Sequence, residues 1–375
     1  MASTLEQLIN VYDPDAPLAR AATPPSSWYT NERIFKLEKQ TVFSHSWQVV
    51  GRIDQLRSPG DYISAEVAGE PLLVVKGSDR LLRGFFNVCR HHAAMLVTDA
   101  AGTRENLRCP YHGWTYDLKG ELIGTPDFAA VEEFDKSANG LMPIPVSLWG
   151  NWIFVNFTAN GSTLRDYLGA GLIEKIESLG LQRLRWLERR CYTVKCNWKV
   201  FVDNYLDGGY HVPHVHEALN TVLDHKTYTI ETDQRVCIQS APMVSNNADP
   251  VTADVRRGRR ALYFWIYPNL MINWYEGVMD TNLVCPRSVD QTDVIFDFYF
   301  SDISDAAREQ NRQSISVSEK IQAEDKAICE SVQRGLNSRA YDLGRLSVRR
   351  EAGEHLFHRL LHADLKRGIA GSDKT

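Results

Sequence analysis

The chain lacks the features that mark membrane, secreted and nucleic-acid-binding proteins. No uninterrupted apolar run approaches the roughly 18 residues that a membrane-spanning helix needs. The first residues, MASTLEQLINVYDPDAP, are acidic and polar, unlike a signal peptide. Positive charge is not in excess, because the formal net charge is -5 at pH 7. We therefore expect a cytoplasmic protein that spans no membrane and binds no nucleic acid.

Cysteine is also scarce, with seven residues in a chain of 375. Only Cys89 and Cys109 have a spacing typical of metal ligands, which argues against a disulfide framework and leaves the other cysteines as expected buried thiols. Two redox motifs are absent as well. No G-x-G-x-x-G opens a helix, and no plant-type C-x4-C-x2-C is present. The chain is therefore not expected to take electrons from NAD(P)H by itself.

Two short pairs of metal ligands are the most specific feature that is present. Cys89-x-His91 and Cys109-x2-His112 are separated by residues 92–108. A Rieske [2Fe–2S] cluster needs this composition, since two thiolates hold one iron and two imidazoles hold the other. The alternative is a structural zinc site, but zinc proteins usually pair cysteine with cysteine and histidine with histidine. We therefore expect a Rieske cluster, a centre that relays single electrons.

A second group of histidines lies in DNYLDGGYHVPHVHE, residues 203–217. On an unbroken helix the side chains of His211 and His216 would point about 140° apart. Pro213 lies between them and is expected to disturb the helix, so that a following loop brings His216 back. Two histidines and one carboxylate form the facial triad that holds Fe(II) and leaves positions open for O₂ and substrate. The pattern predicts a mononuclear iron site, with an ordinary hydrogen-bonded histidine loop as the alternative.

Three segments with different patterns follow one another along the chain. Residues 1–45 are polar and partly helical, and we expect them to pack on the C-terminal domain. Residues 46–157 contain short apolar runs of strand length, which predicts an all-β domain with both Cys/His pairs on its loops. Residues 158–375 mix helices with long aromatic strands and include a charged helix at 303–338. The last 30 residues are polar, with an end of disordered composition.

Three stretches of sequence carry a resemblance to a known family. CRHHAAM with CPYHGWTYDLKGEL, then NWKVFVDNYLDGGYHVPHVH, then EDKAICESVQRGL, resemble the α subunits of Rieske non-heme iron oxygenases over nearly the whole chain. The segments DNYLDGGYHVP, YPNLMINWY, MDTNLV and GRLSVRREAG are most similar to the choline monooxygenase-like branch. The resemblance implies an α+β fold, with the all-β Rieske [2Fe–2S] domain inserted in a helix-grip (START-like) catalytic domain built on an antiparallel sheet. It also implies Asp325 as the carboxylate ligand of Fe(II), with Glu324 as the competitor.

The resemblance further implies subunits in a head-to-tail ring, a trimer or a multiple of three, in which an acidic residue links the cluster of one subunit to the iron of its neighbour. Family members usually carry this residue three positions before the first iron histidine, where this chain has Gly208. Asp207 is our candidate, provided that the two following glycines permit a local distortion such as a π-bulge. Asp203 and Asn204 are the other polar candidates, and Asn204 is expected to orient the iron site.

The reaction implied by the resemblance is hydroxylation of a small substrate by a monooxygenase or dioxygenase that uses O₂. Quaternary ammonium compounds related to choline are the favoured substrates, because a series of aromatic residues that begins at Tyr263 offers cation–π contacts. Aromatic acids, and compounds that lose an N-methyl or O-methyl group after hydroxylation, are the alternatives. Alternate strand residues face opposite sides, so at most half of the series lines one pocket. The candidate substrate-binding residues are Trp265, Tyr267, Trp274 and Tyr275, with Asp280 or Glu276 as a counter-charge.

Electrons must then come from a partner. We expect a separate NAD(P)H-dependent flavin reductase with its own ferredoxin domain. The basic run of Arg256, Arg257, Arg259 and Arg260 is expected to be a solvated loop, or a docking site for an acidic redox partner. A non-catalytic Rieske electron carrier, which would lack the second iron, is the remaining alternative.

Overall fold

The computed structural model describes residues 3–158, 162–244 and 248–372, and the chain divides into two compact units. The larger unit is formed by Met1–Val42 and Leu168–Thr375, and the smaller unit by Phe43–Tyr167. The smaller unit is therefore an insertion between two parts of the larger one. The sequence had predicted the corresponding changes at residues 45/46 and 157/158.

The smaller unit is built of short antiparallel strands in three sheets. Their orders are β5-β2-β3-β4-β9, β1-β11-β10 and β6-β7-β8. The strands are β1 (Gln48–Arg52), β2 (Asp61–Val67), β3 (Glu70–Lys76), β4 (Leu82–Phe86), β5 (Ala101–Thr103), β6 (Leu107–Arg108), β7 (Thr115–Tyr116), β8 (Leu122–Gly124), β9 (Pro143–Ile144), β10 (Val146–Trp149) and β11 (Trp152–Val155). One helix, α4 (Leu164–Leu168), follows them.

The larger unit contains one antiparallel sheet with the order β12-β18-β17-β16-β15-β14-β13. Six strands form a meander, because each pairs with the next along the chain, and the first strand joins at the far edge. The strands are β12 (Arg185–Val194), β13 (Thr229–Asp233), β14 (Val236–Pro242), β15 (Arg260–Ile266), β16 (Leu270–Tyr275), β17 (Val278–Ser288) and β18 (Gln291–Phe300).

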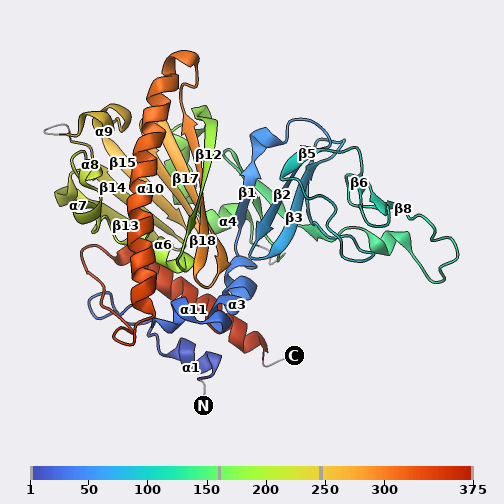
Figure 1. Ribbon diagram of the computed structural model, residues 1–375, viewed down its shortest axis with the longest axis horizontal. Coiled ribbons are helices and arrows are strands. Elements are labelled where there is room, and N and C mark those ends of the chain that lie inside the picture. Colours follow the sequence, from blue (N-terminus) through green and yellow to red (C-terminus); the bar gives the residue numbers. More distant parts are fainter. Residues whose placement is uncertain (1–2, 159–161, 245–247, 373–375) are drawn as a thin grey trace. The chain divides into compact units, whose positions relative to one another are not determined.

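Two long helices, α10 (Arg308–Leu336) and α11 (Ala352–Ser372), lie against this sheet (Figure 1). The first of them, α10, buries residues three or four positions apart, among them Asn311, Ser314, Ser318 and Gln322, so its buried stripe is largely polar. The helices of the larger unit are α1 (Leu5–Asn10), α2 (Ser27–Thr30), α3 (Glu32–Glu38), α5 (Ala170–Ser178), α6 (Trp198–Leu206), α7 (Val212–Val215), α8 (Glu217–Asn220), α9 (Pro250–Val255), α10 (Arg308–Leu336) and α11 (Ala352–Ser372). With the inserted all-β unit, this sheet and its helices confirm the predicted fold class.

The helix α11 continues to Ser372, so the predicted disorder does not extend into the described part of the C-terminal segment, and residues 373–375 lie outside the described residues. Phe357, Leu361 and Leu365 are fully buried and recur every four residues, which places them on one face of the helix. The N-terminal helices α1 and α3 contact α11. Polar residues occupy exposed positions of the helix, and Glu354, His358 and Asp364 are polar residues that are buried, which together gives the segment its polar composition.

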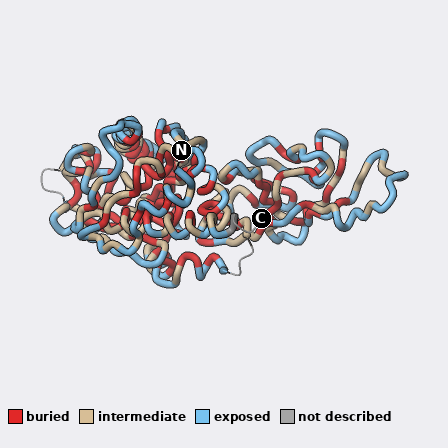
Figure 2. Tube along the Cα trace, turned by 90° about the horizontal axis from the view of Figure 1, so that it is seen from below, coloured by how far each residue is buried: buried red, intermediate tan, exposed pale blue. Residues whose placement is uncertain are grey.

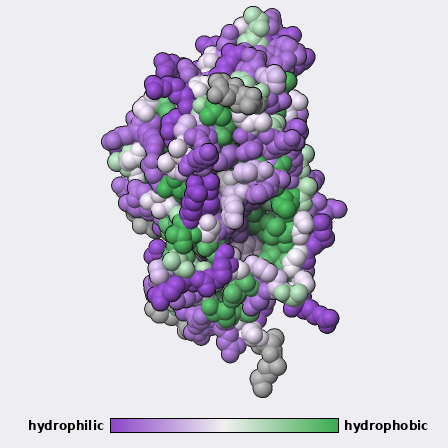
Figure 3. Space-filling view, turned by 90° about the vertical axis from the view of Figure 1, so that its left-hand side faces the viewer, coloured by the Kyte–Doolittle hydropathy of each residue, from purple (hydrophilic) through white to green (hydrophobic). Residues whose placement is uncertain are grey.

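Each unit has its own buried interior (Figure 2). On the face drawn in Figure 3, hydrophobic side chains form small separate patches among hydrophilic ones. Among the described residues, each helix is too short or too polar to cross a bilayer.

Candidate functional site

The first Cys/His pair lies on a tight loop after β4. The N–H of Cys89 donates to the carbonyl of Ala94 (2.8 Å), and the N–H of Ala93 donates to the carbonyl of Cys89 (3.0 Å). Ala93 has a φ of 61°, in the left-handed region that favours glycine. The loop therefore holds a non-glycine residue in a costly conformation, a feature typical of functional sites.

The second Cys/His pair lies on a loop of the same design between β6 and β7. The N–H of Cys109 donates to the carbonyl of Trp114 (2.8 Å), and the N–H of Gly113 donates to the carbonyl of Cys109 (3.1 Å). Gly113 has a φ of 73°. Each cysteine is thus followed, four positions later, by a left-handed residue that closes the loop. The two backbone cages match although the Cys-to-His spacing differs by one residue.

The cysteines lie inside the two loops and the histidines outside. Cys89 and Cys109 are 2% and 3% exposed, whereas His112 is exposed. The ring centroids of His91 and His112 are 4.8 Å apart. The Nδ1 atom of His91 is buried and has no partner among the described residues, as a ring nitrogen that binds iron requires. Nitrogen atoms of His92 lie in the same group.

The surroundings of the thiols also fit a cluster. The hydroxyl of Tyr116 lies 3.4 Å from Sγ of Cys89 and accepts the N–H of Arg90 at 3.0 Å. Trp114 stacks on His91 with ring centroids 4.6 Å apart. Burial, with a contribution from the neighbouring Cys89, raises the pKa of the Cys109 thiol. Two buried thiols side by side give up their protons readily only when a metal takes their place. These residues therefore fit a [2Fe–2S] cluster.

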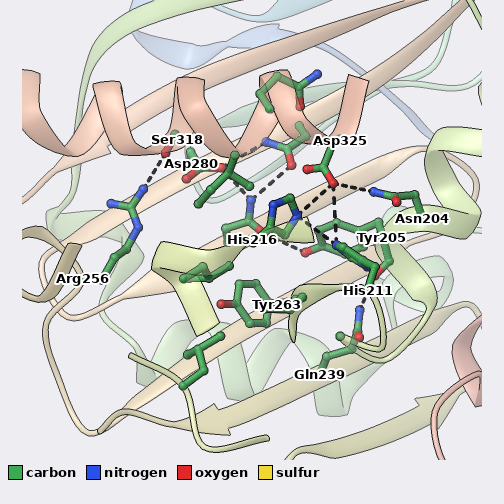
Figure 4. A pocket seen from close by; sticks show the side chains of 18 of the residues that line it. Asn204, Tyr205, His211, His216, Gln239, Arg256, Tyr263, Asp280, Ser318 and Asp325 are labelled. Carbon is green, nitrogen blue, oxygen red and sulfur yellow. Dashed lines mark hydrogen bonds and ion pairs between the residues drawn. The ribbon is translucent and has the colours of Figure 1, made fainter. Parts of the chain in front are cut away.

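Three ligand atoms from distant parts of the sequence converge in the larger unit (Figure 4). Nε2 of His211 and Nε2 of His216 are 3.0 Å apart. Oδ1 of Asp325 lies 3.1 Å from Nε2 of His216 and 3.7 Å from Nε2 of His211. Burial lowers the pKa of His216, but the carboxylates of Asp325 and Glu324 outweigh it and raise the pKa overall. The arrangement therefore favours a positive charge between the three atoms, and its donor set suits Fe(II).

The chain reaches this geometry by ending a helix. The helix α6 ends at Leu206, Asp207 caps it, and both Gly208 and Gly209 have a φ of 66°. A Cβ atom on Gly208 would overlap the carbonyl oxygen of Arg350. The local distortion that we expected is thus a helix end with two left-handed glycines, and the suggested π-bulge is wrong.

The role that we expected for Pro213 is also corrected. Pro213 stands in the first turn of α7, where proline is tolerated because its missing N–H has no helical partner. The break falls at His216, whose φ of -111° and ψ of 74° separate α7 from α8. This non-helical residue, 2% exposed, turns its ring back toward His211. His214, which lies between them, is exposed.

Each of the two converging histidines has a carboxylate on its far side. Oδ2 of Asp207 lies 2.6 Å from Nδ1 of His211 and accepts the backbone N–H of His211 at 2.9 Å. Oε2 of Glu324 lies 2.7 Å from Nδ1 of His216. Carboxylates in this position fix the ring and its tautomer, so that Nε2 points at the metal. Glu324, the competitor for the ligand position, therefore faces the other nitrogen of a histidine, and Asp325 is the carboxylate that faces the two Nε2 atoms.

The other polar candidates of this segment separate into two groups. Nδ2 of Asn204 donates to Oδ1 of Asp325 at 2.8 Å, on the same oxygen that faces the histidines. Asp203 faces elsewhere, accepting from the hydroxyl of Tyr29 (2.7 Å) and lying 2.9 Å from Nε2 of His358. Asn204 is thus placed to orient the carboxylate, and Asp203 is not.

A cavity opens beside the three converging atoms (Figure 4). Its empty volume, including its opening to solvent, is about 800 Å³. Four tyrosines line it, and hydrogen bonds tie their hydroxyls to neighbouring residues, which fixes the rings. The shortest of these bonds joins the hydroxyls of Tyr263 and Tyr275 at 2.8 Å. The four are Tyr205, Tyr228, Tyr263 and Tyr275.

Three of the four aromatic residues predicted to contact substrate lie elsewhere. Trp265 is on the same face of the sheet as Tyr263, but further along, where it packs against Phe357 of α11. Tyr267 follows the end of β15, and its hydroxyl donates to Asp364 at 2.7 Å. Trp274 is an immediate neighbour of Tyr275 in β16 and therefore points to the opposite face. Strand alternation and the position of α11 account for all three corrections.

Tyr275 is the candidate that does line the cavity, together with Asp280. Asp280 is 2% exposed, and its Oδ2 accepts from Asn273 (2.7 Å) and Asn282 (3.0 Å). Burial raises the pKa of Asp280, while Arg256 and the two amides oppose that rise. Glu276, the alternative counter-charge, is exposed.

Sequence reasoning missed Tyr205 and Tyr228, although Tyr205 lies in the same motif as Asn204. It also misassigned Arg256, which was expected in a solvated loop or docking site with the rest of its basic run. Arg256 is 3% exposed, lines the cavity and donates to Ser318 Oγ at 2.6 Å. Nothing within the arginine run distinguishes Arg256 from its neighbours, because the partner lies on α10.

Comparison with known proteins gives consistent results. A family model described as the ring hydroxylating alpha subunit (catalytic domain) matches residues 181–366, and one described as the Rieske [2Fe-2S] domain matches residues 46–135. The chloroplastic choline monooxygenase of Arabidopsis thaliana is 38% identical over 97% of this chain and 88% of its own length. The carnitine monooxygenase oxygenase subunit of Acinetobacter baumannii is 30% identical, covering 86% of this chain and 87% of its own. The solved structure of a quaternary ammonium Rieske monooxygenase has a TM-score of 0.82 at 28% identity, over 94% of this chain and 96% of that one.

Proposed function

The chain belongs to the Rieske non-heme iron oxygenase α subunits, and from this premise we propose that it hydroxylates an N-methyl group of a quaternary ammonium compound. It is an oxygenase whose cofactors are a Rieske [2Fe–2S] cluster and a mononuclear iron. The proposal covers the substrate class and the residues that carry the reaction.

We assign Cys89, His91, Cys109 and His112 to the cluster, and His211, His216 and Asp325 to the iron. When bound, the cluster supplies single electrons and the iron supplies the site at which O₂ is activated. His211, His216 and Asp325 would hold the iron next to the cavity, and the coordination positions that the protein does not occupy would be available for O₂ and substrate. Asn204 holds the carboxylate of Asp325, while Asp207 and Glu324 hold the two imidazoles in the tautomer that presents Nε2.

The observation that carries the substrate class is the set of four tyrosines that line the cavity, together with the buried carboxylate of Asp280. The faces of aromatic rings attract a quaternary ammonium by up to about 2 kcal/mol each when water is excluded. The similar proteins whose names mention choline, carnitine and quaternary ammonium support this choice. Hydroxylation of a carbon attached to nitrogen gives a hemiaminal that can collapse, so hydroxylation and demethylation share their first step.

We also propose a homotrimer, or a multiple of three, in which Asp207 bridges the iron of one subunit and the cluster of the next. Its carboxylate contacts His211 directly, which is what a bridge to that iron needs. The similar quaternary ammonium monooxygenase is described with inter-subunit electron transfer. A separate NAD(P)H-dependent flavin and ferredoxin reductase supplies the electrons in this proposal. A cytoplasmic location stays a prediction from the sequence.

A single-turnover assay tests the proposed function. Protein with a reduced cluster and a full complement of iron is mixed with ¹⁸O₂ and either quaternary amines or aromatic acids, and products are identified by mass spectrometry. We expect ¹⁸O in a product of a quaternary amine. Product from an aromatic acid alone would refute the proposal. A protein that holds the cluster but takes up no second iron would indicate an electron carrier instead.

His211→Ala provides the control for the site. It is expected to abolish oxygenation and leave the visible absorption of the cluster unchanged. His214→Ala, at an exposed neighbour in the same short segment, is expected to change neither. Loss of the cluster absorption in His211→Ala would show that the two metal sites are misassigned.

A further inference from the structure

Arg256 is the one member of the basic run that is buried, since Arg257, Arg259 and Arg260 are exposed. It follows the end of α9, and its guanidinium donates to Oγ of Ser314 (2.6 Å) and Oγ of Ser318 (2.6 Å). The guanidinium also lies 4.9 Å from the centre of the Tyr275 ring. A charged group has therefore been taken out of water at the wall of the cavity (Figure 4).

The partners of this cation are all uncharged. Among the described residues, no carboxylate lies within ion-pair distance of Arg256, and its buried Nε has no hydrogen-bond partner. Asp280 interacts with Arg256 only through long-range electrostatics. Its Oδ2 accepts hydrogen bonds from Asn273 and Asn282. Buried guanidinium groups are normally paired, since two hydroxyls and the more distant carbonyl of Ser314 (3.3 Å) do not replace the lost hydration.

A second polar side chain of the cavity wall, Gln322, also lacks partners in the described part of the chain, and it lies one helical turn along α10 from Ser318. Gln322 is 2% exposed and lines the cavity, and both its Oε1 and its Nε2 are buried without a partner among the described residues. Ser314, Ser318, Gln322 and Asp325 follow one another along one face of α10 at spacings of three or four residues. One helix thus carries polar groups from Arg256 to the iron ligand.

We propose that Arg256, together with Gln322 in the same cavity wall, binds the carboxylate of a zwitterionic substrate whose quaternary ammonium end lies at the iron ligands. The inference rests on the proposed function and narrows it to carboxylated betaines. Ser318 and Asp325 are seven residues apart, which is about 10 Å along a helix, so the substrate is elongated. Choline carries no anion and would leave the guanidinium as unpaired as it is without ligand.

The opposing explanation is that Arg256 has a purely structural role, with Asp280 balancing its charge at a distance. In that case the binding of ligands would not depend on a carboxylate. The two explanations are separated by a pair of ligands that differ only in this group. γ-Butyrobetaine and its methyl ester have the same trimethylammonium end and nearly the same length, but the ester carries no negative charge.

The experiment measures binding to the holoprotein by isothermal titration calorimetry, without turnover. The ligands are γ-butyrobetaine, its methyl ester and choline, and the proteins are wild type, Arg256→Gln, Arg256→Lys and Arg257→Gln. Arg257 is the matched control, because it is adjacent, exposed and paired with Asp254 at 2.8 Å. The comparison of acid with ester on wild-type protein decides the question even where a variant of Arg256 fails to fold.

We expect wild type to bind γ-butyrobetaine roughly 10- to 100-fold more tightly than its ester, the range of one charge-assisted hydrogen-bonded contact. Arg256→Gln is expected to remove this difference, Arg256→Lys to restore part of it, and Arg257→Gln to preserve it. Equal binding of acid and ester would overturn the inference. If the single-turnover assay then shows that choline is oxidised, the proposed function still stands. Turnover of an aromatic acid alone would refute both.

Discussion

Replacing Asp207 by Asn tests whether this carboxylate only holds a histidine or also carries electrons. In the structure its Oδ2 contacts both Nδ1 and the backbone N–H of His211, at 2.6 and 2.9 Å. Asn keeps the shape and one acceptor oxygen but loses the charge. The control is Glu324→Gln, because Glu324 makes the equivalent contact with Nδ1 of His216 at 2.7 Å. Both substitutions remove a carboxylate behind an iron histidine, and only Asp207 is proposed as the bridge.

The magnitude follows from this equivalence. Loss of a carboxylate that orients a metal-binding histidine costs about 10- to 100-fold in metal affinity or activity, or about 1.4 to 2.7 kcal/mol. Both variants are therefore expected to bind iron more weakly by a similar factor. At saturating iron this shared effect is removed, and any further slowing belongs to the path of the electron.

The assay is stopped-flow reoxidation of the reduced cluster, followed by its visible absorption, after mixing with substrate and O₂ at saturating iron. We expect reoxidation to be slower in Asp207→Asn than in Glu324→Gln, because only Asp207 is proposed to carry electrons between subunits. Similar rates in the two variants would refute the bridging role and leave Asp207 as a residue that positions His211.

Three further predictions concern single backbone or titrating positions. Gly208→Ala is expected to lower the free energy of unfolding by more than about 1 kcal/mol and to reduce iron content, because its φ is positive and the added Cβ meets a carbonyl oxygen; Gly171→Ala, with open space around it, is the control in urea unfolding. Ala93→Gly is expected to raise the free energy of unfolding by about 0.5 to 1 kcal/mol, and Gly113→Ala is expected to lower it, in the same unfolding assay. The same effect in both variants would show that the left-handed conformation costs nothing. Burial raises the pKa of Glu354 well above its usual range, so the folded protein binds more protons at this residue than the unfolded chain does. The stability of wild type therefore falls as pH rises from the usual pKa of a glutamate toward the folded-state pKa. Glu354→Gln should melt at a higher temperature than wild type at high pH but not at low pH, and a difference that stays constant with pH would contradict this.

The parts of the site that follow from local sequence were the easiest to predict. Cys89 and Cys109 each sit in a loop closed by hydrogen bonds within six residues, so the spacing of the ligands carries most of the geometry. The strands of the smaller unit follow from their short apolar runs. The helix α11 was missed although Phe357, Leu361 and Leu365 repeat at a helical interval, because charged residues on its other faces dominate the composition.

The parts that depend on distant contacts were not accessible in the same way. Asp325 meets His216 across 109 positions of sequence, and only the family resemblance pointed to it. Tyr263 and Trp265 share one face of β15, and what separates a cavity wall from a packed core there is the position of Phe357 on α11. Arg256 is buried because serines 58 and 62 positions later receive it. Strand alternation excludes half of the strand residues from the cavity side of the sheet. Which of the remaining residues line the cavity depends on the helices that cover that side.

The helix α10 joins the chemistry and the proposed specificity of this site in one rigid element. Asp325 faces the iron histidines, and the serines that hold Arg256 lie two to three turns earlier on the same helix. Because a helix keeps a fixed rise per residue, the serines that hold Arg256 stay at a fixed distance from Asp325. An ammonium group alone can bind against any of several tyrosines, whereas in the proposed binding mode a carboxylate at Arg256 would fix how far the ammonium end reaches toward Asp325 and the two histidines. We therefore expect the length of the substrate, more than its positive charge, to select the compound that is oxidised.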